Sequence, residues 1–185
     1  MKRLILVIGL LVVILLAGAI FWWYKTKSFS PENSVVFQDG DLTITVSYNR
    51  PFKKGRVIFG GLVPYGKTWR TGANEATVME TNQDLYLDGK KLSKGKYSLW
   101  TVPGEQQWQV IFNTTIPPWG IDVMKDGQAA RDPQGTELVV DVPVMNSPKE
   151  IEQFTITVEK MNDSMELVLM WDRTLVAVPF SLNAQ

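Results

Sequence analysis

The segment from Trp69 to Glu75 holds the side chains best suited to bind a ligand. Within seven residues it supplies a flat aromatic face, a planar guanidinium, an amide and a carboxylate: Trp69, Arg70, Asn74 and Glu75. Such a set can bind a polyol or a ligand that carries a carboxylate, because guanidinium and carboxylate form paired, charge-assisted hydrogen bonds. A structural interpretation competes, in which Arg70 and Glu75 pair with each other or with nearby backbone, since buried charges need partners in any case.

Trp119 is the fifth candidate ligand-binding residue. It follows two prolines at the start of the segment 114–135, which contains no predicted strand. Structureless loops of this length are uncommon and usually have a function or are disordered. In contrast, Trp108 and Trp171 lie in predicted strands, where tryptophan most often fills the core.

The absence of two residue types excludes several kinds of chemistry. The chain contains no histidine and no cysteine, so it has no Ser-His-Asp triad, no cysteine nucleophile, no disulfide and no ordinary zinc site. Four acidic residues in or beside the long loop have oxygen ligands that suit calcium: Asp122, Asp126, Asp132 and Glu137. Their spacing matches no standard calcium loop, so we predict a solvated acidic surface, no metal site and no cofactor.

The N-terminus has the properties of a membrane anchor. Residues 4–24 carry no charge, and at the helical rise they span roughly 31 Å, the thickness of a bilayer core. Basic residues flank this run, and aromatic residues gather at its end: Lys2, Arg3, Lys25 and Lys27; Phe21, Trp22, Trp23 and Tyr24. We predict a transmembrane anchor at 1–24, a polar tether at 25–33 and a globular domain at 34–185. A cleaved signal peptide is the alternative, but its apolar part is usually shorter.

The distribution of charge suggests a location and excludes one class of partner. The slight excess of positive charge before the apolar run predicts a single-pass protein of the cell membrane with a cytoplasmic N-terminus and an extracytoplasmic, periplasmic domain. From residue 28 onward the chain has 15 basic and 19 acidic residues, a net charge of −4. A mildly acidic domain lacks the basic surface of a nucleic-acid binder.

Beyond the anchor, the hydrophobic pattern alternates with a period of two. In residues 42–48, and again in 153–158, apolar and polar side chains alternate as in a half-buried strand. We predict about ten strands, near 34–38, 41–48, 75–81, 84–87, 96–102, 107–113, 137–142, 151–159, 164–171 and 174–181. Turn signals such as Asp88-Gly89, Asn162-Asp163 and Asp172-Arg173 separate them. The predicted fold is an all-β, two-sheet antiparallel sandwich, with a jelly roll as one variant, preceded by one transmembrane helix.

Three parts of the domain together resemble a known bacterial family. They are the run from Tyr65 to Glu75, the Gly95-x-Tyr97-Ser98-Leu99 hairpin, and Trp119-Gly120. In these motifs the chain resembles DUF2911, a family of unknown function. The resemblance implies an exported, β-rich bacterial domain and transfers no activity. After Gly120 the sequence departs from the family's usual pattern.

The leading functional hypothesis is a non-catalytic extracytoplasmic module that binds a small polar ligand, a glycan or a protein partner at the membrane surface. A cell-envelope hydrolase is the first alternative, with Glu75 and one loop aspartate as acid and base. That mechanism requires two facing carboxylates roughly 5 to 10 Å apart. A purely structural partner of another membrane protein is the second alternative, for which an exposed apolar patch would be the mark.

Overall fold

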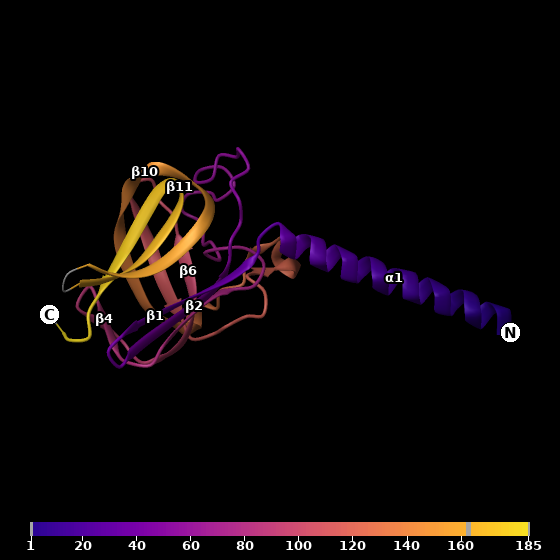
Figure 1. Cartoon of the computed structure of the whole chain (residues 1–185), viewed down its shortest axis with the longest axis horizontal. Coiled ribbons are helices and arrows are strands. Elements are labelled where there is room, and N and C mark those ends of the chain that lie inside the picture. The colour runs from indigo at the N-terminus through magenta and orange to yellow at the C-terminus, as the bar shows by residue number, and fades with distance from the viewer. Residues whose placement is uncertain (1, 162–163, 185) are drawn as a thin grey trace.

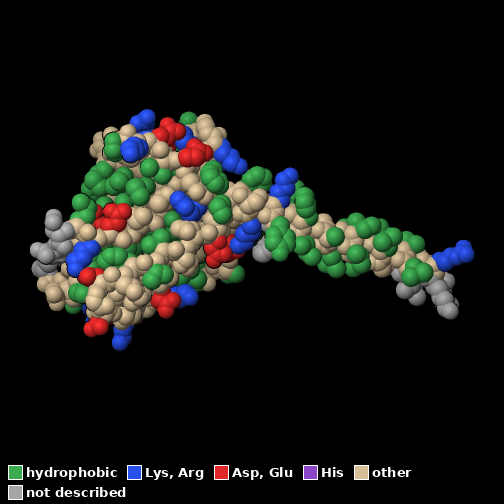
Figure 2. Space-filling model, viewed as in Figure 1, with side chains coloured by type: hydrophobic (Ala, Val, Ile, Leu, Met, Phe, Trp, Pro, Cys, Tyr) green, Lys and Arg blue, Asp and Glu red, His purple; other side chains and the backbone are tan. Residues whose placement is uncertain are grey.

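A long N-terminal helix projects from a β domain in the computed structural model, which describes residues 2–161 and 164–184 (Figure 1). The helix α1 runs from Lys2 to Ser28. From Leu6 to Ser28 it is long and apolar enough to cross a membrane, and its most apolar part contains no buried residue among those described. Figure 2 shows its surface dominated by hydrophobic side chains, with basic side chains at its two ends. Such a surface suits hydrocarbon and is poorly suited to water.

The helix extends into the segment that the sequence predicted as a polar tether. Residues 25–28 are still helical and the first strand begins at Glu32, so only residues 29–31 separate the helix from the sheet. Thr26 donates a hydrogen bond from its hydroxyl to the carbonyl oxygen of Trp22, within the last turns of the helix. The helix α1 therefore meets the domain through a very short connection.

Seven strands form one antiparallel sheet in the order β1-β2-β3-β6-β7-β10-β11. Their bounds are β1 (Glu32–Asp39), β2 (Leu42–Asn49), β3 (Thr77–Thr81), β6 (Gly95–Val102), β7 (Gln107–Asn113), β10 (Thr136–Met161) and β11 (Ser164–Phe180). Two small hairpins flank it: β4 (Leu85–Leu87) with β5 (Lys90–Leu92), and β8 (Ile121–Asp122) with β9 (Gln128–Ala129). Two short 3₁₀ helices lie in the long loop: η1 (Val123–Lys125) and η2 (Pro133–Gly135).

The long strand β10 turns this sheet into two layers. Its first part pairs with β7 as far as Pro143, and from Val144 onward it pairs with β11. The β10–β11 ribbon then crosses over the remaining strands (Figure 1), and the hydroxyl of Tyr48 on β2 accepts a hydrogen bond of 2.8 Å from the amide of Ile156 on β10. The predicted all-β fold with one N-terminal apolar helix is confirmed, as a sandwich-like half-barrel.

Two predicted breaks do not interrupt the strands. The expected gap between residues 142 and 151 and the expected turn at Asp172-Arg173 lie inside β10 and β11, where the register shifts between Asn146 and Ile151. This part of β10 contains Pro148, which has no amide to donate to a ladder and is tolerated at bulges. On β11, Asp172 pairs with Ile151 at this register shift and has a φ of 56°. These turn residues therefore mark a bulge. The turn predicted at 162–163 lies outside the described residues.

The core is built from the alternating faces of the strands. In β2 the inward side chains of Leu42, Ile44 and Val46 are completely buried. Trp108 and Trp171 are 2% and 1% exposed, so the predicted core positions of both tryptophans are confirmed. Burial of large aromatic side chains of this kind is a major stabilising contribution to a small domain.

Candidate functional site

A pocket of about 480 Å³ opens at the end of the domain from which α1 emerges. Three segments form its lining: residues 29–30 just after the helix, the irregular segment 51–73, and the β8–β9 hairpin. Trp171 contributes from β11. Its size falls in the range of small-molecule sites, which usually combine apolar lining with a few polar groups.

Backbone contacts hold the segment 51–73 in a defined shape. The amide of Trp69 donates to the carbonyl oxygen of Thr101 at 2.7 Å, and the amide of Thr101 donates back at 3.1 Å. Next along the chain, Thr71 takes a φ of 53°, and Gly72 passes so close to β2 that an added Cβ would lie 2.9 Å from the carbonyl oxygen of Asn49. The glycine is therefore needed for this close approach, and it fixes the direction in which the neighbouring side chains point.

Trp69 forms a rigid side of the pocket. Its ring stacks on that of Trp171 with centroids 5.9 Å apart and an angle of 17° between the planes. Phe154 meets it edge-on at 5.0 Å, and Trp108 at 6.3 Å. Ring pairs at these distances and angles are favourable beyond the area they bury. Trp69 thus belongs both to the core and to the lining of the pocket.

Arg70 lines the same pocket and has no counter-ion in the described part of the chain. Its aliphatic part packs on Gly120, where an added Cβ would lie 2.4 Å from Cδ of Arg70. Its Nε is buried and has no hydrogen-bond partner, and no ion pair to Arg70 exists among the residues that the structure describes. Burial lowers the pKa of Arg70 from its ordinary value. An arginine that loses water without gaining an acceptor is costly to fold.

Two further cations face the pocket. Lys54 places its Nζ 4.6 Å from the ring centre of Phe29, and Arg56 donates from Nε to the carbonyl oxygen of Lys53 at 3.0 Å. These contacts involve a ring and a neutral carbonyl group, and neither cation has an ion pair within residues 2–161 and 164–184. No acidic residue occurs among the described residues that line the pocket. The lining therefore combines aromatic surface with three positive charges.

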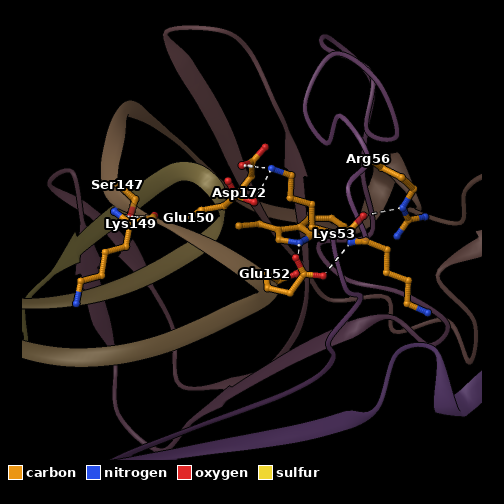
Figure 3. Close-up of polar contacts among 9 residues, drawn as sticks. Lys53, Arg56, Ser147, Lys149, Glu150, Glu152 and Asp172 are labelled. Carbon is orange, nitrogen blue, oxygen red and sulfur yellow. Dashed lines mark hydrogen bonds and ion pairs between the residues drawn. The ribbon is translucent and has the colours of Figure 1, made fainter.

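Carboxylates at the β10–β11 bulge are bound by a different cation. Figure 3 shows Lys53 directed at Glu150 and Asp172, with Nζ to oxygen distances of 2.9 and 2.8 Å. The hydrogen bonds with Asp172 and then Glu150 raise the pKa of Lys53. Glu152 accepts a hydrogen bond from the amide of Lys54 at 2.9 Å. This network fastens the start of segment 51–73 to the bulge between β10 and β11.

Two of the predicted site residues lie where the domain meets α1. Glu75 accepts hydrogen bonds from Lys27 and, at 2.9 Å, from Nδ2 of Asn49. Burial alone would raise the pKa of Glu75, but the hydrogen bond and charge of Lys27, with the other donors, lower it overall. Asn74 is 7% exposed and directs Nδ2 toward the carbonyl oxygen of Ser30 at 3.5 Å. Neither residue lines the pocket.

The long loop positions the site through its backbone. Trp119 is half-buried and does not line the pocket, whereas its neighbour Gly120 packs on Arg70 and donates its amide to the carbonyl oxygen of Asn74 at 2.8 Å. Two of the loop aspartates cap 3₁₀ helices: Asp122 accepts from the amide of Met124, and Asp132 from that of Gln134, both at 3.0 Å. Their carboxylates thus stabilise local turns.

The structure brings together only Trp69 and Arg70 of the five candidates, and it adds residues that the sequence did not single out. Chief among these are Phe29, Lys54 and Arg56. The basic run at residues 53–56 was a visible signal. Its proximity to Arg70 depends on a chain reversal that no periodic pattern indicates.

Comparison with known proteins gave one match. The family model described as "Protein of unknown function (DUF2911)" matches residues 30–180, which include nearly the whole β domain. The comparisons with curated proteins and with solved structures gave no match.

Proposed function

The chain belongs to the DUF2911 family, whose description assigns no activity, and from the geometry of the pocket we propose that the domain is a non-catalytic module that binds a small anionic ligand beside its membrane anchor. Arg70 is the observation that carries this proposal, because its Nε is buried in the pocket without a hydrogen-bond partner and the side chain has no counter-ion among the described residues. A phosphate or carboxylate would supply the missing acceptor.

The surroundings of Arg70 favour ligand binding over catalysis. Hydrolysis by two carboxylates requires a facing pair at the substrate, and no carboxylate occurs among the described lining residues. Glu75, the acid that a hydrolase would use, is held by Lys27 and Asn49 at the anchor junction. The aromatic face of Trp69 would contact the uncharged part of the ligand.

The membrane location supports the same proposal. We place α1 across the cell membrane with the N-terminus in the cytoplasm and the domain on the periplasmic side. The basic residues before the apolar run support this orientation, and the exposed apolar surface of the helix from Leu6 onward supports the membrane span. The pocket would then face ligands at the outer surface of that membrane.

Thermal unfolding of the full-length protein in nanodiscs of zwitterionic lipid tests the proposal. Inorganic phosphate and small phosphate or carboxylate esters are added in turn, and an anion at 100 times its dissociation constant should stabilise the fold by about 2.7 kcal/mol. The response should vanish in Arg70→Met and persist in Lys149→Met, which neutralises an exposed lysine outside the pocket. If no anion gives an Arg70-dependent shift, the proposed function is wrong.

A further inference from the structure

The β8–β9 hairpin presents the most exposed large apolar side chains of the described β domain. Val123 is 79% exposed and Met124 is 92% exposed, both at the tip of the hairpin. The base of the same hairpin lines the pocket through Ile121 and Ala129. The tip is held in shape, because Asp122 accepts from the amide of Met124 and lies 3.5 Å from Nζ of Lys125.

These apolar side chains lie close to where α1 would leave the bilayer. Figure 1 shows the segment 121–129 beside the domain end of α1, and this segment and the residues just after the helix, Phe29 and Ser30, both line the pocket. From Tyr24, in the aromatic cluster, to Ser28 the helix rises about 6 Å, comparable with the roughly 5 to 7 Å thickness of one head-group layer. Phe29, which follows, is 50% exposed and lines the pocket. The pocket therefore lies at the outer edge of the lipid head-group layer.

The charges around the pocket complement an anionic lipid. Lys54, Arg56 and Arg70 line it, and Lys125 lies at the hairpin tip. Basic side chains near an anionic bilayer surface gain free energy from it, and guanidinium groups bind phosphate in two-pronged geometry. Exposed apolar side chains at the same level gain free energy by entering the interface.

We propose that the pocket binds the phosphate head group of an anionic membrane lipid while Val123 and Met124 insert into the bilayer around it. This inference rests on the proposed function and names the source of its anion. A soluble phosphate compound has the same charged group, but it gives no role to the exposed hairpin tip. A lipid head group uses both the cationic lining and the apolar tip.

The absence of native cysteine allows the first test to use single labels on the full-length protein. Met124→Cys and Lys149→Cys are labelled with an environment-sensitive fluorophore in nanodiscs of phosphatidylcholine and phosphatidylglycerol. Acyl chains brominated near the head group should quench the label at residue 124 and leave the label at residue 149 unaffected. Equal, weak quenching at both positions would overturn the insertion of the hairpin.

The second test separates lipid from soluble anion by thermal unfolding. Phosphatidylglycerol in the disc should raise the Tm by about 5 °C over phosphatidylcholine alone, a shift expected for ligand saturation in a domain of this size. Arg70→Met should abolish the rise, and Lys149→Met should retain it. If only soluble glycerol phosphate gives an Arg70-dependent rise, the lipid inference fails and the proposed function holds. If neither source gives one, both fail.

Discussion

Lys53 and Arg70 belong to the same irregular segment, yet the partners of their positive charges differ. Lys53 binds two carboxylates at the β10–β11 bulge, and hydrogen bonding raises its pKa. Arg70 is half-buried beside Gly120 without a counter-ion among the described residues, and burial lowers its pKa. A fold that can satisfy one cation so completely leaves the other unpaired at a pocket. This difference suggests that the first cation holds the segment in place and the second serves a ligand.

The largest loss of stability is expected from a substitution in the core that supports both regions. Trp108→Ala should lower the free energy of unfolding by about 3 to 5 kcal/mol, because it opens a cavity beneath the aromatic side of the pocket. Trp108 is 2% exposed and contacts Trp69 and Phe59. Urea titration followed by circular dichroism measures the loss. A midpoint equal to that of the parent would show that the core does not support the pocket as described.

A smaller effect is expected from Gly120→Ala, which disturbs only the Arg70 region. The new methyl group would lie 2.4 Å from Cδ of Arg70, and overpacking of this kind typically costs about 1 to 3 kcal/mol. Arg70→Ala removes Cγ and Cδ, so the double variant should lose less stability than the two single variants predict together. Additive losses in this double-mutant cycle would contradict the packing of Arg70 on the loop.

The smallest expected change in stability concerns the contact between Glu75 and the end of α1. Because its pKa is lowered in the folded protein, the ionised carboxylate contributes stability above its unfolded value near 4.5, and this contribution is lost as the pH falls through the folded pKa. The side chain is 36% exposed, so solvent screening limits the contribution to about 0.5 kcal/mol. Glu75→Gln should thus melt below the parent at pH 7 and approach it below pH 4, in scans at several pH values. A constant difference would exclude this ion pair as the cause.

The strands were predictable from sequence because each carries its own signal. The alternation at residues 42–48 required no knowledge of partners, and the buried tryptophans followed from their positions in such strands. The β10–β11 bulge was not predictable, because residue types such as Pro148 and Asp172-Arg173 are found in turns and in bulges alike. The ladder that continues past them is a long-range property of the fold.

The predicted site residues lie in two separate places for a similar reason. Trp69, Arg70, Asn74 and Glu75 are adjacent in sequence, but positive φ values at Thr71 and Asn74 turn the chain between them. The first two residues consequently line the pocket, and the last two contact the end of the anchor. Spacing alone could identify the residue types suited to binding, whereas the backbone conformation decides which of them share a surface.

The most direct test of the central claim compares the stability of Lys53→Met with that of Arg70→Met in the full-length protein, without added ligand. Lys53→Met should unfold at lower urea, because it removes the ion pairs of Lys53 with Glu150 and Asp172. Arg70→Met should unfold within about 0.5 kcal/mol of the parent or slightly above it, because it removes a desolvated charge and keeps the aliphatic packing. A loss for Arg70→Met as large as that for Lys53→Met would show that Arg70 is a structural cation, and would contradict the account.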